Sequence, residues 1–444
     1  MNALRTLALG LLLALTLLLP AAGDPLVATG VWAVCLAILA RSHPSGLLSF
    51  GCLYLLLLGV FHLGLVAPLA LGATAAAAPA WTRSLAFPSA VSLVSIAFAA
   101  FTFGARFRGA VPHGAAPIPS RPMLFFAGAA VALLGAALVL HGGRQAGVFT
   151  SGYGAFFHRA MTADARLFNV GLMVFPIGFV VAAVGATRRQ LVVIVAGVLA
   201  VLAPLFLAGF RGPVIVHLAT LIAVWAHKDF VMARRAALSL AVAAIVLVPA
   251  VRYTRDTRAD LATGLAAYDP LALFTEAGTS LYPLVITADR IDSGAEPLWL
   301  GRSYATAIGR TLPNFGQRAS LDARGMTPNG WATLQADRWL YVRGGGIGFS
   351  GVAEPYLNFG RIGVVVFFFL LGLVLQRWEN WLARDPFRAA AAAATFGFVL
   401  WTVRNESMEL FRSMAFAALV VGGAWMVHRV LHRRTSRAAL AAAA

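Results

Sequence analysis

Two carboxylates stand out by the residues around them. Glu276, in LFTEAGTSLYPL, lies among apolar residues with helix-like spacing. Glu354, in GFSGVAEPYLNFGRIGV, comes just before a long apolar run. Burial raises the pKa of a carboxyl such as Glu276 toward the range in which it can act as a general base. A structural ion pair with an arginine, or for Glu354 a helix cap, would explain the same residues. The spacing therefore predicts two candidate functional carboxylates, and for Glu276 a general-base role.

Four arginines could bind a phosphorylated substrate. Arg211 lies between two apolar runs in LAGFRGPVIVHL, where an arginine is costly unless it is paired or faces a wet cavity. Arg252 and Arg255 follow an apolar run directly and would share one face of a continuing helix, and Arg361 follows Glu354 at the edge of the next run. The planar guanidinium binds phosphate oxygens in pairs. A snorkelling arginine at the membrane interface is the alternative for each.

Several aromatic residues have an apolar face and a polar edge that suit a sugar ring. Tyr253 lies between the two arginines Arg252 and Arg255, and Tyr356 lies two residues after Glu354. We expect both to contact substrate. The other candidates are Trp299, Trp331, Trp339 and Tyr341. For these four and for Tyr356, an interfacial belt or a place in a local core is the more usual role.

Motifs for nucleotide, metal and nucleophilic chemistry are missing from the sequence. Gly346, Gly348 and Gly351 match GxGxxG formally, but no strand precedes them, so we expect them to let the backbone approach a ligand closely. There is no HExxH, no Walker loop and no Ser-His-Asp spacing. Cys35 and Cys52 both lie inside apolar runs, as small buried residues do. We therefore expect no metal and no cofactor.

The elements that must position these residues are membrane-spanning helices. Of the 444 residues, 60% are apolar and only 12% are charged, and the mean hydropathy is +0.81. Crossing a hydrocarbon core of about 30 Å takes about 20 helical residues. The sequence predicts an all-α polytopic bundle of about twelve spans, roughly at 4–22, 26–41, 46–70, 86–105, 122–140, 167–186, 190–209, 212–227, 236–251, 358–376, 388–403 and 413–430. The first span also resembles a signal peptide that could be cleaved.

The basic residues predict the orientation of the chain. With both termini in the cytoplasm, the cytoplasmic segments hold 17 basic residues and three acids, or +14 of the total charge of +18. The high positive charge then reflects the orientation of the chain in the membrane. We expect it to interact with membrane lipid and not with nucleic acid. Three regions follow: spans one to nine in 1–250 with an outside loop near 142–166, a large extracytoplasmic loop at 251–357, and spans ten to twelve with a basic tail in 358–444. The large loop holds ten arginines and ten acids, so we expect the functional side chains to be those beside the membrane.

The second half of the chain resembles the Wzy-type polymerases of O-antigen and exopolysaccharide repeat units. Three blocks carry the resemblance: AGFRGPVIVHL, the stretch from TEAGTSLYPL through GRSYATAIGRTLPN, and GIGFSGVAEPYLNFGRIGV. The resemblance implies a multi-pass glycosyltransferase of the bacterial inner membrane with its site on the periplasmic side. It also implies polyprenyl-pyrophosphate-linked oligosaccharides as donor and acceptor, and a flippase and a chain-length regulator as partners.

In such an enzyme, an acceptor hydroxyl attacks the anomeric carbon of the donor and the lipid pyrophosphate leaves. This reaction needs a base and fixed cations. The resemblance therefore implies Glu276 or Glu354 as the catalytic base. It assigns the pyrophosphate and sugar contacts to Arg211, Arg252, Arg255, Arg361, Tyr253 and Tyr356. An O-antigen ligase-like enzyme would use the same donor, and a flippase or transporter would place more charge inside the spans.

Overall fold

The computed structural model describes residues 10–443, except 12, 15, 19, 73–77, 108–117, 151–163, 258–260, 267, 268, 270, 312–325, 344 and 383. Over these residues the chain is built from helices, without a strand, which confirms the all-α class. Among the described residues, seven helices are long and apolar enough to cross a membrane: α5 (Phe87–Phe107), α6 (Pro122–Gln145), α8 (Asp164–Gly185), α9 (Arg188–Leu207), α11 (Phe230–Thr257), α18 (Ala353–Leu382) and α20 (Met408–Ala443). These agree with a polytopic helical membrane protein. Residues 4–9, 12, 15 and 19 of the predicted first span, and Tyr153, His158 and Arg159 of the 142–166 loop, lie outside the described residues.

The remaining helices are shorter. Three are apolar: α2 (Pro25–Ala40), α3 (Phe50–Leu63) and α10 (Arg211–Ala226). The others are α4 (Val66–Ala70), α12 (Leu261–Ala266), α13 (Ala272–Gly278), α14 (Tyr282–Asp292), α15 (Arg302–Thr311), α16 (Pro328–Ala336), α17 (Arg338–Val342) and α19 (Pro386–Trp401). The 3₁₀ turns are η1 (Pro20–Gly23), η2 (Gly46–Leu48), η3 (Ala80–Arg83) and η4 (Thr279–Leu281). Within 251–357 the described chain is thus mostly short helices.

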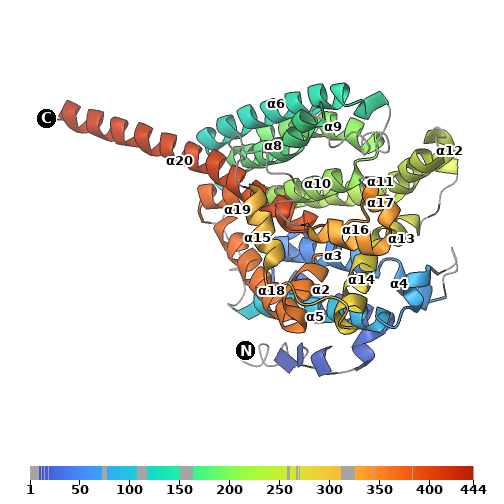
Figure 1. The fold of residues 1–444 in the computed structure, drawn as a ribbon. Helices are drawn as coiled ribbons and strands as arrows, with labels where there is room; N and C mark the ends of the chain where they lie inside the picture. Colours follow the sequence, from blue (N-terminus) through green and yellow to red (C-terminus); the bar gives the residue numbers. More distant parts are fainter. Residues whose placement is uncertain are drawn as a thin grey trace. The chain divides into compact units, whose positions relative to one another are not determined.

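The chain forms two compact units. The first contains residues 1–114, 234–379 and 398–411, and the second contains residues 115–233, 380–397 and 412–444. In the first unit, α5 packs against α2 and α14, and α3 packs against α2 and α13 (Figure 1). Helix α18 lies so close to α5 that a Cβ on Gly104 would be 2.0 Å from the Phe369 carbonyl oxygen. Small residues allow this approach, as is common between membrane helices.

The second unit is organised around the antiparallel pair α6 and α8, which run side by side (Figure 1). Glycines recur every seven residues on both helices, at Gly128, Gly135 and Gly142 on α6 and at Gly171, Gly178 and Gly185 on α8. A Cβ on any of these six would come within 2.6 Å of a backbone atom of the other helix. The spacing keeps one glycine face along the whole pair.

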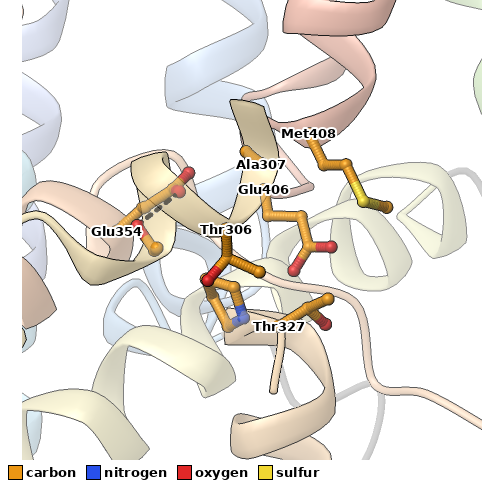
Figure 2. Close-up of a pocket in the computed structure, with 8 residues that line it drawn as sticks. Thr306, Ala307, Thr327, Glu354, Glu406 and Met408 are labelled. Carbon is orange, nitrogen blue, oxygen red and sulfur yellow. Dashed lines mark hydrogen bonds between the residues drawn. The ribbon is translucent and has the colours of Figure 1, made fainter. Parts of the chain in front are cut away.

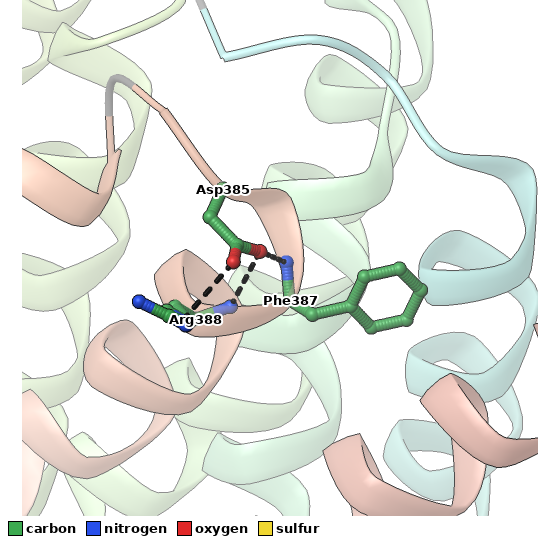
Figure 3. A network of polar contacts seen from close by, with 3 residues as sticks. All are labelled: Asp385, Phe387 and Arg388. Atoms are coloured by element: carbon green, nitrogen blue, oxygen red, sulfur yellow. Dashed lines mark hydrogen bonds and ion pairs between the residues drawn. The ribbon is translucent and has the colours of Figure 1, made fainter.

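Helix ends are fixed by short polar side chains. Asp385 precedes α19, where its Oδ1 accepts hydrogen bonds from the backbone N–H groups of Phe387 (3.0 Å) and Arg388 (3.2 Å), as Figure 3 shows. Its other oxygen lies 3.2 Å from Nε of Arg388. Asp24 caps α2 in the same way through Leu26 and Val27. These side chains satisfy backbone donors that the first helical turn leaves without a partner.

Helix α18 has a break near its beginning. Gly360 has φ 64° and ψ −154°, a conformation that only glycine adopts readily. The residues before it form a short helical piece with Glu354 in its first turn, and the long apolar helix follows. The break therefore separates the segment that carries Glu354 from the helix that packs on α5.

Candidate functional site

The segment around Glu354 is held by a second segment far away in sequence. The backbone N–H of Phe349 donates to the Arg404 carbonyl (2.9 Å), and that of Gly351 donates to the Val403 carbonyl (3.3 Å). A Cβ on Gly351 would lie 2.6 Å from the Thr402 carbonyl oxygen. In the described structure, then, Gly351 permits contact between two backbone segments. This contact brings the residues after α19 next to the start of α18.

Glu354 is buried, with 4% of its surface exposed, and its carboxylate accepts three hydrogen bonds. The Ser303 hydroxyl (2.8 Å) and the Ser407 hydroxyl (2.9 Å) donate to Oε1. The Ser407 backbone N–H donates to Oε2 at 2.8 Å. A carboxylate has about four acceptor positions, so these bonds leave one position on Oε2. The first helical turn also favours negative charge.

Asn358 joins Glu354 to helix α15. Its Nδ2 donates to the Ser303 hydroxyl (2.7 Å) and to the backbone carbonyl of Glu354 (2.8 Å). Its Oδ1 accepts from the backbone N–H groups of Gly301 (2.9 Å) and Ser303 (3.4 Å). Asn358 is fully buried, so these bonds supply the partners that a buried amide needs. The start of α15 is therefore tied to the Glu354 segment.

A second carboxylate, Glu406, lies in the same small pocket as Glu354. The pocket is lined by Ser303, Thr306, Ala307, Thr327, Pro328, Glu354, Glu406 and Met408 (Figure 2). Oε2 of Glu406 accepts a hydrogen bond from the Asn329 backbone N–H at 2.8 Å. Burial raises the pKa of the Glu406 carboxyl, while the bonds from Asn329 and Thr327 and the charge of Arg310 lower it. The pocket thus combines two carboxyl groups with hydroxyls from α15 and from the residue before α16.

Tyr356 and Arg361 lie together on either side of the Gly360 break. The Tyr356 hydroxyl donates to Asp292 Oδ1, and Ser89 donates to the other oxygen of Asp292 at 2.8 Å. Arg361 also interacts electrostatically with Tyr356. Tyr356 is buried, whereas Arg361 is exposed. A substrate could therefore reach Arg361 directly, and Tyr356 holds it near α14.

The remaining predicted site residues are not among those that line this pocket. Glu276 is half-buried on α13, and Arg252 and Tyr253 lie on α11 in the first unit. Arg255 also belongs to α11, but its side chain lies outside the described residues. Arg211 is 8% exposed and begins α10, in the second unit.

Two of the tryptophans are held in a local core. Trp299 and Trp331 are buried, and both indole N–H groups donate to Glu296, at 2.8 and 3.2 Å. Trp339, on α17, is 74% exposed. Among these three tryptophans, only Trp339 has an exposed side chain.

Four residues of this site were not selected from the sequence: Ser303, Asn358, Glu406 and Ser407. Ser303 and Asn358 are uncharged and give no signal of their own. Glu406 and Ser407 belong to a polar run, RNESME, between two apolar stretches. That run was a usable signal, because ionisable residues at the end of a span are costly and are often functional.

Within the described residues, no group of three or more His, Cys, Asp or Glu could hold a metal ion.

Comparison with known proteins gives one family. The sequence model of the O-antigen polysaccharide polymerase Wzy family matches residues 130–434 of this chain. No curated protein and no solved structure matches it. The matched stretch contains all the candidate residues from Arg211 to Arg361 and also Glu406 and Ser407.

Proposed function

Because the chain belongs to the O-antigen polysaccharide polymerase Wzy family, we propose that it joins oligosaccharide repeat units carried on polyprenyl pyrophosphate. The growing glycan on one lipid is the donor, and a second lipid-linked repeat unit is the acceptor. The protein lies in the bacterial inner membrane and works on its extracytoplasmic side. The excess of basic residues in the segments predicted to face the cytoplasm supports this orientation.

In the proposed reaction, Glu354 is the general base. An acceptor hydroxyl forms a bond to the anomeric carbon of the donor, its proton passes to the free position on Oε2, and the bond to the pyrophosphate oxygen breaks. The observation that carries this assignment is the hydrogen bonding of Glu354, since three donors hold the carboxylate and one acceptor position is left. A positioned base typically contributes 10²–10⁴-fold to the rate. Glu276 is the alternative base.

The departing pyrophosphate needs positive charge. We assign this role to Arg211, Arg252, Arg255 and Arg361, with Tyr253 and Tyr356 contacting the sugar or the phosphates. The contact between Arg361 and Tyr356 supports the assignment for that pair, because it holds an exposed guanidinium close to the helical piece that carries Glu354. Arginines bind phosphate oxygens well without a metal ion. The expected partners of the enzyme are a flippase that delivers the units and a chain-length regulator.

The test compares carboxylate-to-amide variants in a strain that lacks its own copy of the protein. Glu354→Gln should fold, because the glutamine oxygen can accept from the Ser407 N–H while the two serine hydroxyls rotate to accept from the amide group. We expect the Glu354→Gln strain to make single repeat units in place of the polymer ladder, while the amount of the variant protein equals that of wild type. Glu276→Gln, measured beside it, tests the alternative base.

Asp337→Asn is the matched control, because asparagine keeps the helix cap that Asp337 provides to α17. It should give the wild-type ladder. A wild-type ladder from Glu354→Gln would remove Glu354 as the base. Loss of single-unit transfer as well as of the ladder would favour a ligase.

A further inference from the structure

His62 on α3 is a buried histidine to which the proposed reaction gives no role. It is 0% exposed and uses both ring nitrogens. Nδ1 lies 2.9 Å from the Leu58 carbonyl oxygen, and Nε2 lies 2.8 Å from the Ser350 hydroxyl. A carbonyl oxygen can only accept, so Nδ1 carries the proton and Nε2 of the neutral ring is an acceptor. The Ser350 hydroxyl therefore donates to His62.

That bond sets the direction of the Ser350 hydroxyl. Because the Ser350 hydroxyl donates its hydrogen to His62, its oxygen is free to accept from the backbone N–H groups of Val352 (3.2 Å) and Ala353 (3.3 Å). The Ser350 carbonyl accepts from the Glu354 N–H at 3.2 Å. Both backbone donors at the start of α18 are thus paired, and the next residue is Glu354. Without an acceptor at His62, nothing in this group would hold the hydroxyl in the direction that the cap needs.

The end of α3 also supports the other candidate base. A Cβ on Gly64 would lie 2.5 Å from the Phe274 carbonyl oxygen, and one on Gly278 would lie 2.0 Å from the Leu65 nitrogen. Helix α13, which carries Glu276, is therefore in backbone contact with the residues that follow His62. The end of α3 and the two residues after it thus contact the segments that carry both carboxylates.

We propose that His62 is a positioning residue, which fixes Glu354 through the Ser350 hydroxyl without touching substrate. The inference rests on the proposed function, since it concerns the placement of the proposed base. A displacement of about 1 Å in a reacting group costs roughly 100-fold in rate. Loss of the His62 acceptor should therefore lower turnover more than it lowers substrate affinity.

The test uses the full chain in liposomes with a lipid-linked repeat unit as substrate. His62→Phe keeps a ring of similar size but removes the acceptor, and His62→Gln restores an acceptor oxygen. We expect kcat to fall roughly 100-fold for His62→Phe with KM within about twofold of wild type, and His62→Gln to recover most of the loss. Ser350→Ala, which removes the hydroxyl, should likewise lower kcat, and Ser350→Thr, which keeps it, should retain most of the activity. These two variants decide the question if His62→Phe does not fold.

Three results would overturn the proposal: wild-type kcat for His62→Phe, equal loss for His62→Gln and His62→Phe, or, where His62→Phe does not fold, equal activity for Ser350→Ala and Ser350→Thr. Glu354→Gln in the same assay separates this inference from the proposed function. If Glu354→Gln is inactive and His62→Phe is normal, only the positioning role fails. If Glu354→Gln is active, Glu354 is not the base.

Discussion

Replacing Gly178 by alanine tests the close packing of α6 and α8. A Cβ at Gly178 would lie 2.2 Å from the Ala132 backbone nitrogen and 2.6 Å from the Ala132 Cα. The shorter distance falls 1.2 Å short of the 3.4 Å at which ordinary contact begins. Backbone atoms cannot rotate away as a flexible side chain can, so the two helices must separate. Overpacking of this kind costs about 1–3 kcal/mol, and occasionally more.

Gly197→Ala on α9 is the matched control. Nothing lies within 4 Å of its added Cβ, so the variant should gain about 1 kcal/mol from the higher helix propensity of alanine. Gly178→Ala gains the same helix propensity, so the two variants should differ in the free energy of unfolding by the overpacking cost alone, about 1–3 kcal/mol, although the substitution is the same. Thermal unfolding of the purified protein in detergent measures the difference as a lower melting temperature for Gly178→Ala. Equal melting temperatures for the two variants would refute the packing described here.

Two further predictions concern the pocket. Burial raises the pKa of Glu406 above its ordinary value of 4.5, so the folded chain favours the protonated form, and this stabilising contribution is present below pH 4.5 and is lost as the pH rises through the folded-state pKa. Glu406→Gln cannot ionise, so its melting temperature relative to wild type should rise as the pH increases above about 4.5, and a constant difference would contradict the raised pKa. Ser303→Ala removes the bond to Glu354 and the one from Asn358, so it should lower the free energy of unfolding by about 2–4 kcal/mol. Ser303→Thr keeps the hydroxyl and should lose less in the same unfolding experiment, and an equal loss would show that the hydroxyl is not the cause.

The fold class could be predicted because hydropathy alone requires helices that satisfy their own backbone groups in lipid. Glu354 could be found because a carboxylate beside a long apolar run is unusual. The pairing of Glu354 with its hydrogen-bond partners could not be predicted, because Ser407 lies 53 residues and Ser303 lies 51 residues away along the chain. Local periodicity does not report which distant segments pair. The contact between Gly351 and the Thr402 backbone is an example, since it depends on two loops meeting.

The glycine-rich segment shows how one residue type serves different purposes. The sequence predicted that its glycines let the backbone approach a ligand. In the described structure, Gly351 lies against another backbone segment, and Gly348 adopts φ +79° next to Arg404. Both uses follow from the missing Cβ. The sequence could locate the glycines that matter, but the partner of each depends on the tertiary fold.

The most direct measurement of the central claim follows one round of transfer by purified protein in liposomes. Lipid-linked repeat units serve as both donor and acceptor, and the joined product and the released polyprenyl pyrophosphate are both quantified. Wild-type protein should produce the two in equal amounts, and Glu354→Gln should produce both at least about 100-fold more slowly while its melting temperature stays close to that of wild type. Product formation by Glu354→Gln at the wild-type rate would contradict the assignment of Glu354 as the base.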